Sequence, residues 1–455
     1  GASADDVMAE LVKVGLEEEG SHGGDISGPV VVGQVLSFDD QAQSNGKTIR
    51  WCQVQVAQPG DESVRGIVCG ASNFAIGDKV VVSLPGAVLP GGFEIAARKT
   101  YGHVSDGMIA SSKELGLGDE HAGILILSEI GLDPDIGLDA ISLLGLDDSA
   151  AEVNVTPDRG YCLSMRGIAR EYSHATGSKF TDPSSKIKLL SGSGFGLNVS
   201  DSMPIHGLDG CSQFVLLGIS GIDANAKVPD WMATRLKLAG MRSISIVVDI
   251  TNYVMLELGQ PLHAYDQGKL VGGISVRRAN SGEEIQTLDE KTRKLDAEDL
   301  LISDEQGPVG IAGVMGGART EVGPQTTAVL IEAAIFDPIS IARSARRHKL
   351  PSEASKRFER GVDSEISGAA ASRAAELLIE LAGGSLDGLG AQYLTEKLPV
   401  SIEMKLNYPT ELVGVHYPPE QVVSTLEQIG CKVSVIGDSV SVTAPTWRPD
   451  IIDKT

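Results

Sequence analysis

The chain has 455 residues and a formal net charge of −23, which excludes a general electrostatic binder of nucleic acid, because phosphates are repelled by an acidic surface. Its length is too great for one compact domain, and at roughly 100–200 residues per domain we expect three or four. Glycine is abundant, with 54 residues, and aromatic residues are few, which favours β-rich or mixed α/β domains with many turns.

The five cysteines are odd in number and far apart, and none forms a C-x-x-C pair. This pattern argues against a disulfide framework and against a zinc site, and it favours the reducing cytoplasm. No apolar run approaches the ~18–20 residues that a membrane span needs, and no signal peptide is visible. The chain begins with Gly1 rather than methionine and stops abruptly at Thr455, so we expect a fragment at both ends.

The first part of the chain predicts a helix followed by a β domain. Residues 1–28 include the amphipathic pattern VMAELVKVGLEEEG and are interpreted as a trimmed N-terminal segment. Residues 29–130 contain the strand candidates VVVGQVLSF, TIRWCQVQVAQ, SVRGIVCG and KVVVSL in quick succession. Short strands at this spacing predict a barrel or sandwich, and a five-stranded OB-fold barrel fits the length.

The rest of the chain predicts mixed structure, so the fold class is α+β multidomain. Residues 131–209 are interpreted as a connecting α/β segment that packs with the next domain. Residues 210–395 alternate strands and helices, with a helix start at Asp337 and a long helix closed by Gly383. Residues 396–455 contain two helix-like segments and two short strands, which predict a small, truncated winged-helix-like domain.

Two apolar segments carry polar residues that need an explanation. In VVDITNYVMLELGQPLHAYD, Asp249, Asn252, Glu257 and His263 interrupt a sequence otherwise suited to burial. In VLIEAAIF, Glu332 is a lone carboxylate in an apolar strand. A buried carboxylate needs a hydrogen-bonding or ionic partner, so we expect Glu332 to have one.

Several long motifs resemble one family. They are VCGASNFAIGDKVVVSLPGAVLPGGFEIAARKTYGHVSDGMIASSKELGLG, TPDRGYCLSMRGIAREY, MRSISIVVDITNYVMLELGQPLHAYD, AGVMGG and RRHKLPSEASKRFERGVD. Together they resemble the bacterial phenylalanyl-tRNA synthetase β subunit over nearly the whole chain, and the first resembles its tRNA-binding OB module. Family members continue into a catalytic-like and an anticodon-binding domain, which are absent here.

The resemblance implies a cytoplasmic subunit that binds tRNA(Phe) and scaffolds the α subunit in an α2β2 heterotetramer. The α subunit uses ATP for aminoacylation, whereas the β subunit carries an editing domain that hydrolyses tyrosine wrongly attached to tRNA(Phe). A physical argument supports a separate editing site. A pocket for phenylalanine rejects tyrosine only imperfectly, whereas a second site can demand the extra hydroxyl.

The resemblance also implies roles for individual residues. His263 and Asn252 would be catalytic, orienting the attacking water or the terminal ribose hydroxyl near the scissile ester. Glu332 would accept a hydrogen bond from the tyrosine hydroxyl, and Arg242 would contact the terminal nucleotide. The other residues expected to line this pocket are Gly316, Ser352 and Ala354. Chain order marks no nucleophile–base pair, so we expect water rather than a covalent intermediate.

Structural alternatives exist for each assignment. A single histidine beside proline is typical of a satisfied core or loop histidine, and Glu332 could be the buried ion-pair partner of an arginine. Asp249 and Glu257 are interpreted as structural caps or hydrogen-bond acceptors. The rival function is a non-editing scaffold subunit that binds tRNA; a free-standing tRNA chaperone explains too little of the chain.

The basic run from Arg343 to Arg360 holds seven Lys or Arg against two Glu. In an acidic protein such a cluster is a candidate phosphate contact, with Arg346 and Arg347 as its central residues. An internal salt-bridge network with the surrounding acids is the alternative. In the OB module, Arg98 and Lys99 are further candidates for tRNA contact.

Asp450, in the motif TWRPD, is a candidate metal ligand. The resemblance implies a magnesium site shared with the α subunit, which Asp450 begins and acidic residues a few positions later complete. A hard cation requires several oxygen ligands, and the chain ends at Thr455, so the site is incomplete as given. On its own, Asp450 is predicted to cap a helix.

Overall fold

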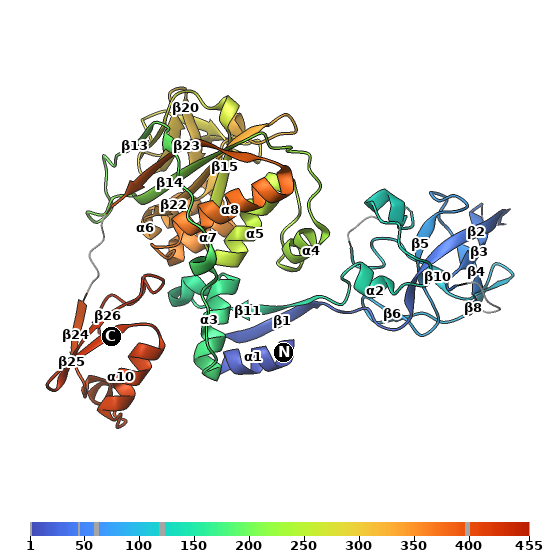
Figure 1. Cartoon of the computed structure of the whole chain (residues 1–455), viewed down its shortest axis with the longest axis horizontal. Helices are drawn as coiled ribbons and strands as arrows, with labels where there is room; N and C mark the ends of the chain where they lie inside the picture. Colours follow the sequence, from blue (N-terminus) through green and yellow to red (C-terminus); the bar gives the residue numbers. More distant parts are fainter. Residues whose placement is uncertain (1, 44–45, 59–62, 118–122, 396–400, 455) are drawn as a thin grey trace. The chain divides into compact units, whose positions relative to one another are not determined.

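The structure is a computed structural model that describes residues 2–43, 46–58, 63–117, 123–395 and 401–454. The chain divides into a unit of residues 19–152 and a larger unit of residues 1–18 and 153–455 (Figure 1). Strands β1 (Glu17–Gly23) and β11 (Ser149–Asn154) form a two-stranded sheet at these divisions. Residues 396–400, at the start of the predicted C-terminal domain, lie outside the described residues. Among the described helices, none is long and apolar enough to cross a membrane.

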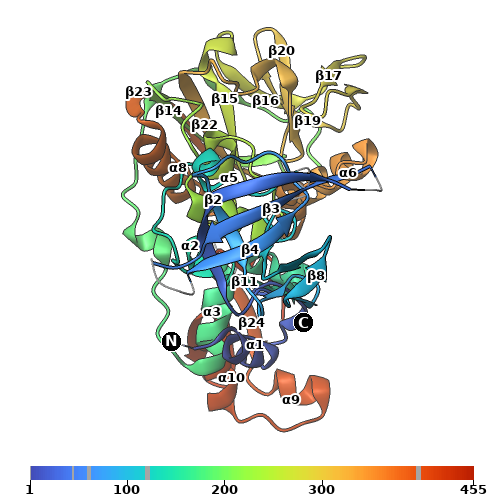
Figure 2. The same cartoon turned by 90° about the vertical axis from the view of Figure 1, so that its right-hand side faces the viewer.

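The unit of residues 19–152 is built on five antiparallel strands in the order β10-β5-β2-β3-β4, and Figure 2 shows β2, β3 and β4 side by side. Their bounds are Val30–Ala42 (β2), Thr48–Gln55 (β3), Val64–Cys69 (β4), Lys79–Ser83 (β5) and Met108–Ile109 (β10). Asp106 N–H donates to the Gly66 carbonyl at 2.8 Å, and Val68 N–H donates to Ser105 Oγ at 3.0 Å. These bonds join β4 to the residues just before β10, so the two edges of the sheet approach each other. The four strand candidates are confirmed.

Shorter elements complete this unit. They are the hairpin strands β6 (Val88–Leu89), β7 (Phe93–Glu94), β8 (Arg98–Thr100) and β9 (His103–Ser105), the 3-10 helix η1 (Leu127–Ile130) and the helix α2 (Ala140–Leu143). The hairpins pair β6 with β7 and β8 with β9.

Residues 131–152 pack differently from the prediction. We expected them in a connecting segment against the next domain, but they belong to the β unit. Gly137 N–H donates to the Val32 carbonyl at 2.8 Å, and Val32 N–H donates to the Leu138 carbonyl at 2.9 Å. Ala140 and Leu146 are buried in the same apolar core as Val32. Local composition did not reveal this, because the partner strand β2 begins about a hundred residues earlier in the chain.

The larger unit contains two five-stranded sheets. The first has the order β12-β23-β14-β22-β15, and the second β13-β16-β19-β20-β21. The bounds of the first are Ser193–Gly194 (β12), Cys211–Ser220 (β14), Leu262–Asp266 (β15), Ala328–Phe336 (β22) and Ser385–Leu394 (β23). Those of the second are Leu197–Val199 (β13), Ile274–Arg278 (β16), Leu300–Asp304 (β19), Gly307–Ile311 (β20) and Met315–Gly316 (β21). A hairpin of β17 (Glu284–Gln286) and β18 (Thr292–Lys294) lies beside them.

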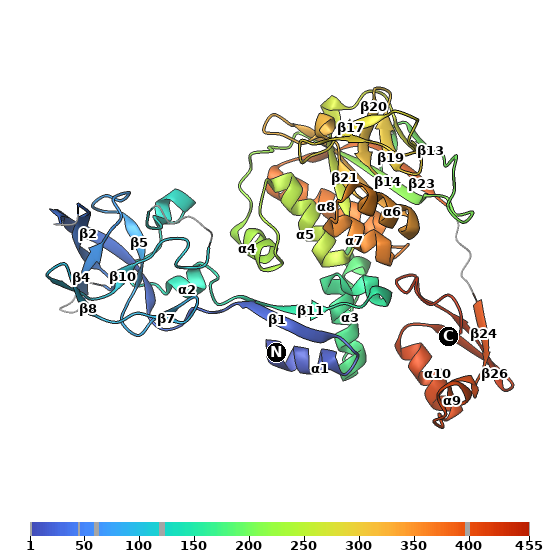
Figure 3. The same cartoon turned by 180° about the vertical axis from the view of Figure 1, so that it is seen from behind.

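Helices cover the first sheet. Helix α8 (Ser367–Ala382) packs on β14 and β22, and α5 (Ile246–Leu258) packs on β15 and α8. Figure 3 shows α5 beside α8. The remaining helices of this region are α4 (Asp230–Leu238), η4 (Gln267–Lys269), η5 (Ala318–Thr320), α6 (Pro338–His348) and α7 (Glu353–Arg360). One apolar core contains Ile331 of the first sheet, Ile302 of the second and Leu378 of α8. This shared core holds the facing edges of the two sheets at fixed positions.

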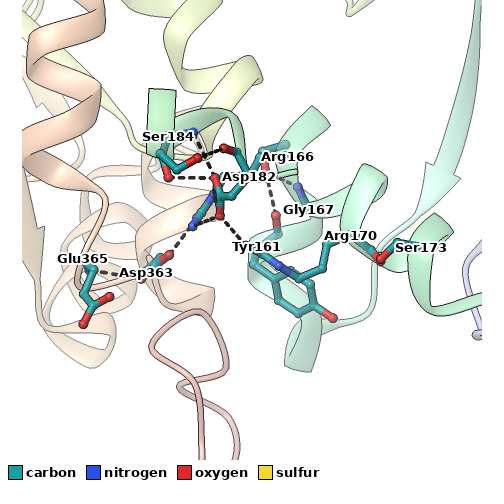
Figure 4. A network of polar contacts seen from close by, with 11 residues as sticks. Tyr161, Arg166, Gly167, Arg170, Ser173, Asp182, Ser184, Asp363 and Glu365 are labelled. Atoms are coloured by element: carbon teal, nitrogen blue, oxygen red, sulfur yellow. Dashed lines mark hydrogen bonds and ion pairs between the residues drawn. The ribbon is translucent and has the colours of Figure 1, made fainter. Parts of the chain in front are cut away.

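Hydrogen bonds between polar side chains hold the segment that precedes these sheets in place. It comprises α1 (Ala4–Val12), η2 (Pro157–Cys162), α3 (Met165–Thr176) and η3 (Pro183–Lys186). The Asp182 carboxylate accepts hydrogen bonds from Arg166 at 2.7 Å and from Arg170 at 2.9 Å, and Arg166 also donates to Asp363 at 2.7 Å (Figure 4). Although burial opposes ionisation, the bonds from Arg166 and Ser184 lower the pKa of Asp182 to about 2. The network therefore ties α3 and η3 to the loop between α7 and α8.

The last region is a small α+β domain. A three-stranded antiparallel sheet has the order β24-β26-β25 and carries two helices. The elements are β24 (Ser401–Lys405), α9 (Tyr408–Val413), α10 (Pro419–Gln428), β25 (Lys432–Ile436) and β26 (Ser439–Thr443). The two predicted helices and two of the strands are present, whereas β24 was missed.

Candidate functional site

Strand register brings two of the predicted residues together. His263 of β15 lies directly opposite Glu332 of β22 in the antiparallel ladder. Directly opposed residues project from the same face of a sheet, with their Cβ atoms about 5 Å apart. The two residues, 69 positions apart in the sequence, therefore share one face at the edge of the first sheet.

The partner of Glu332 is Tyr265, which the sequence analysis did not identify. Glu332 is only 5% exposed, and the Tyr265 hydroxyl donates a hydrogen bond to Glu332 Oε2. Burial raises the pKa of Glu332 from 4.5 to about 7, although the bond from Tyr265 opposes the shift. No arginine pairs with Glu332 among the residues that the structure describes, so the ion pair considered as an alternative is not present there. The signal that could have found Tyr265 was the two-residue period, which puts His263 and Tyr265 on one strand face.

His263 is a half-buried, neutral imidazole. Burial lowers its pKa to about 4, so it is uncharged at neutral pH. Its ring packs edge-on against the Tyr265 ring, with centroids 4.6 Å apart. Its Nε2 atom is buried and has no hydrogen-bond partner among the residues that the structure describes. An unpaired buried nitrogen costs free energy, so it is suited to a ligand or water that supplies the missing hydrogen bond.

Gly316 forms the wall beside His263. A Cβ atom on Gly316 would lie 2.5 Å from His263 Cε1 and 2.9 Å from Nε2, so no larger residue fits without moving the imidazole. Gly316 ends β21, the edge strand of the second sheet, whereas His263 lies on the edge strand of the first. The candidate site therefore lies where the two sheet edges meet.

Ser352 and Ala354 support this wall. Ser352 caps α7 by accepting from Ser355 N–H at 3.0 Å, and its hydroxyl donates to the Val314 carbonyl at 2.9 Å. Val314 precedes the strand that ends with Gly316, so Ser352 links α7 to the wall. Ala354 is half-buried and packs on the shared apolar core.

Arg242 and Asn252 are not joined to this cluster. Arg242 is exposed in the loop before α5, and Asn252 is half-buried on α5. No hydrogen bond or ion pair links either to His263 or Glu332 within the described residues. Asp249 is fully buried and accepts from Ile244 N–H at 2.8 Å, which orders the loop that carries Arg242. Its predicted structural role is confirmed.

Glu257 also has a structural partner. Its carboxylate accepts a hydrogen bond from Arg373 Nε at 3.1 Å, which connects α5 with α8. The predicted structural role of Glu257 as an acceptor is therefore confirmed.

The basic run from Arg343 to Arg360 contains residues that bind other groups of the protein and residues that are exposed to solvent. Arg347 binds the fully buried Asp299 and also Glu298, the latter at 2.7 Å. Arg357 and Arg360 donate to the carbonyls of Leu163 and Val155. The internal salt-bridge network considered as an alternative is therefore present for Arg347, and Arg357 also pairs with Glu353 at 2.7 Å, whereas Arg360 is held by a backbone carbonyl. Arg346, by contrast, is exposed on α6 and has no ion-pair partner in the described part of the chain.

The remaining predicted contacts lie elsewhere. Arg98 and Lys99 are exposed on β8, and the Arg98 guanidinium lies 5.7 Å from the centre of the Phe93 ring. Asp450 accepts hydrogen bonds from Arg448 at 2.6 and 2.8 Å, and the described residues 451–454 that follow it form no helix, so the prediction that it caps a helix is wrong. No group of three His, Cys, Asp or Glu side chains suited to one metal occurs among the described residues. Because Arg448 already occupies both oxygens of Asp450, this residue does not by itself fit a magnesium site.

Three family models match the chain. A putative tRNA binding domain matches residues 30–130, a B3/4 domain residues 210–383 and a tRNA synthetase B5 domain residues 402–455. The B3/4 match contains His263, Gly316 and Glu332, so the candidate site lies within one of the matched domains.

Curated relatives match along the full chain. A phenylalanine–tRNA ligase beta subunit of Leifsonia xyli subsp. xyli is 58% identical, with 100% of this chain and 55% of that protein aligned. The subunits of Streptomyces avermitilis and Thermobifida fusca are 52% and 50% identical over 98% and 99% of this chain. The chain spans about half the length of these relatives. An N-terminal fragment of the phenylalanyl-tRNA synthetase beta-subunit from Pyrococcus horikoshii aligns at 15% identity, over 67% of this chain and 84% of that one, and its TM-score of 0.34 is too low to establish a shared fold.

Proposed function

The chain belongs to the family of bacterial phenylalanine–tRNA ligase β subunits, and from this premise we propose that it binds tRNA(Phe) and hydrolyses wrongly attached tyrosine. The observation that carries the proposal is the pair of the buried Glu332 and the half-buried His263, opposed in register beside Gly316. This places a hydrogen-bond acceptor and a neutral base side by side where two sheets meet.

Glu332 supplies the selectivity in this proposal. The phenolic hydroxyl of a tyrosyl group would donate a hydrogen bond to the carboxylate, whereas a phenylalanyl group would leave the carboxylate without that donor. An unmade hydrogen bond to a buried group costs about 1–3 kcal/mol, which favours tyrosine by roughly five- to 150-fold. Such a site therefore prefers tyrosine, whereas a pocket for phenylalanine prefers phenylalanine and rejects tyrosine only imperfectly.

His263 supplies the hydrolytic step. Its pKa of about 4 keeps the imidazole neutral at pH 7, so Nε2 can accept a proton or a hydrogen bond from water or from the ribose hydroxyl. Water then attacks the ester carbonyl, and the tyrosine carboxyl and the ribose hydroxyl separate. Asn252 would orient the water or the ribose, and Arg242, exposed before α5, would contact the terminal nucleotide on its arrival.

The assembly is part of the same proposal. We place the chain in the cytoplasm with an α subunit, which would use ATP and magnesium for aminoacylation, in an α2β2 heterotetramer. We also assign residues 29–130 to an OB-type barrel, supported by the hydrogen bonds that connect β4 to the residues before β10. The two helices and three-stranded sheet of residues 401–443 are compatible with a winged-helix-like domain.

Deacylation tests the proposal. The chain is expected to accelerate hydrolysis of Tyr-tRNA(Phe) over the spontaneous rate and to leave Phe-tRNA(Phe) largely intact. Release of labelled amino acid measures both rates. His263→Ala should remove the acceleration, whereas His416→Ala, at an exposed histidine of the last domain, should not. If saturating tRNA is bound and neither ester is hydrolysed, the non-editing scaffold replaces this proposal.

Arg346 and Arg347 form a matched pair for testing tRNA contact. Arg346→Gln is expected to reduce the slope of log binding constant against log salt by about 0.7–0.9, the value for one lost phosphate contact. Arg347→Gln should instead lower the free energy of unfolding, because Asp299 would be left buried without that partner. Titration of tRNA binding at several KCl concentrations and urea unfolding measure the two effects. Equal salt slopes in the parent and Arg346→Gln would assign Arg346 no role in phosphate binding.

A further inference from the structure

Tyr265 belongs to the candidate site but has no role in the function proposed so far. It is fully buried on β15, two residues beyond His263, and its ring packs against the imidazole at an interplanar angle of 81°. Its hydroxyl donates to Glu332 Oε2 across the ladder between β15 and β22. A phenylalanine would fill the same volume in the core, so packing alone does not explain the hydroxyl.

The two oxygens of Glu332 are used differently. Oε2 accepts the hydrogen bond from Tyr265, whereas Oε1 has no hydrogen bond within the part of the chain that the structure describes. An ionised carboxylate can accept several hydrogen bonds through its two oxygens. Because a carboxylate is planar, fixing Oε2 to a rigid partner also fixes the direction of Oε1.

We propose that Tyr265 is a positioning residue that holds Glu332 by Oε2 and presents Oε1 as the acceptor for the phenolic hydroxyl of a tyrosyl ester. The inference rests on the proposed function. It assigns the tyrosine preference to an oriented pair, Tyr265 and Glu332, rather than to Glu332 alone. The rigid β-ladder supports this role, because a side chain anchored on a strand varies little in position.

The charge of Glu332 determines whether Oε1 can accept. The titratable groups that surround it are His263 and Tyr265 on β15, and Cys211 on β14, whose thiol pKa is raised by burial and then by Glu332. The Tyr265 hydrogen bond favours the carboxylate form and so opposes the effect of burial on the pKa of Glu332. Removing the hydroxyl should therefore raise that pKa further, and ionisation of Glu332 would then require a higher pH.

Binding of non-hydrolysable analogues tests this role apart from catalysis. The probes are adenosine with tyrosine or phenylalanine joined to the 3′ position through an amide, titrated by calorimetry between about pH 6 and 9. Tyr265→Phe is expected to reduce the preference for the tyrosyl analogue about tenfold at pH 7, and to recover part of it at high pH. In the parent, the preference should increase with a midpoint near the Glu332 pKa of about 7.

The matched control is Tyr161→Phe. Tyr161 is also buried and donates its hydroxyl to a glutamate, Glu171, at 2.6 Å, but it lies on η2, outside the B3/4 region. Tyr161→Phe should leave the preference for the tyrosyl analogue, and the pH midpoint of that preference, unchanged. A double variant of Tyr265→Phe and Glu332→Gln should bind both analogues as Glu332→Gln alone does, because Tyr265 acts only through Glu332.

The outcomes separate the two proposals. Equal preference and equal pH midpoint in the parent and Tyr265→Phe would overturn the positioning role. A parent that binds both analogues equally would overturn it too. If the parent prefers the tyrosyl analogue and Tyr265→Phe does not, but Tyr-tRNA(Phe) is never hydrolysed, the positioning role stands and the proposed hydrolysis falls.

Discussion

Replacing Glu332 with glutamine is expected to stabilise the fold at neutral and alkaline pH by about 3 kcal/mol. Burial raises the pKa of Glu332 from 4.5 to about 7, so ionisation is easier in the unfolded chain. Below pH 4.5 both states are protonated and the shift costs nothing. As the pH rises from 4.5 to 7, the unfolded state loses its proton first, and the native state is destabilised progressively. At 1.36 kcal/mol per pKa unit, the full cost is about 3 kcal/mol, which uncharged glutamine avoids.

Urea unfolding of the parent and Glu332→Gln from pH 4.5 to pH 8 measures this difference. Comparing the two proteins at each pH cancels the titration of other groups to first order. Glu171→Gln is the matched control, because Glu171 is also buried and also accepts from a tyrosine hydroxyl. Burial favours the protonated form of Glu171, but the hydrogen bonds with His174 and Tyr161 outweigh this effect and lower the pKa of Glu171. Its replacement should therefore destabilise the protein at neutral pH, and less so as the pH falls.

The opposite signs of these two effects distinguish a structural from a functional carboxylate. Glu171 contributes to stability, so the fold alone accounts for it. Glu332 is expected to reduce stability at neutral pH, so the fold does not account for a carboxylate at this position, whereas recognition of a hydroxyl group does. If Glu332→Gln gained no stability at pH 8 relative to pH 4.5, the raised pKa and this argument would both be wrong.

Local sequence signals predicted individual elements well. Asp337 was expected to start a helix, and its side chain accepts from Ser340 N–H at 2.7 Å at the beginning of α6. Gly383 was expected to close a long helix, and it follows α8 with a φ of 75°. Each signal depends on a few neighbouring residues, so no knowledge of the tertiary fold was needed.

Contacts across the sheets could not be predicted in the same way. The bond from Tyr265 to Glu332 depends on the register between β15 and β22, which many intervening residues separate. The basic run similarly looked uniform in the sequence, but Asp299 and Glu298, which lie just before β19, bind Arg347 and not Arg346. The residue types of the site were therefore predictable, whereas their partners required the fold.

Replacing Gly316 with alanine is expected to reduce the rate of Tyr-tRNA(Phe) hydrolysis roughly 100-fold while leaving the protein folded. The added methyl group would lie 2.5 Å from His263 Cε1, closer than non-bonded carbon atoms approach, so the imidazole must move. A displacement of about 1 Å in a reacting group can cost about 10²-fold in rate. Hydrolysis of Tyr-tRNA(Phe) and thermal unfolding, measured on the same preparation, separate the loss of activity from any loss of structure.

Gly323→Ala is the control for this variant. Gly323 follows η5 in the same region, and a Cβ atom there would have no heavy atom within 4 Å. Neither glycine adopts a positive φ, so alanine introduces no backbone strain at either position and the two variants differ mainly in the contact with His263. Gly323→Ala should therefore hydrolyse Tyr-tRNA(Phe) at the parent rate. Full activity in Gly316→Ala would mean that the position of His263 does not limit the reaction, and the histidine would lose its catalytic role in favour of a structural one.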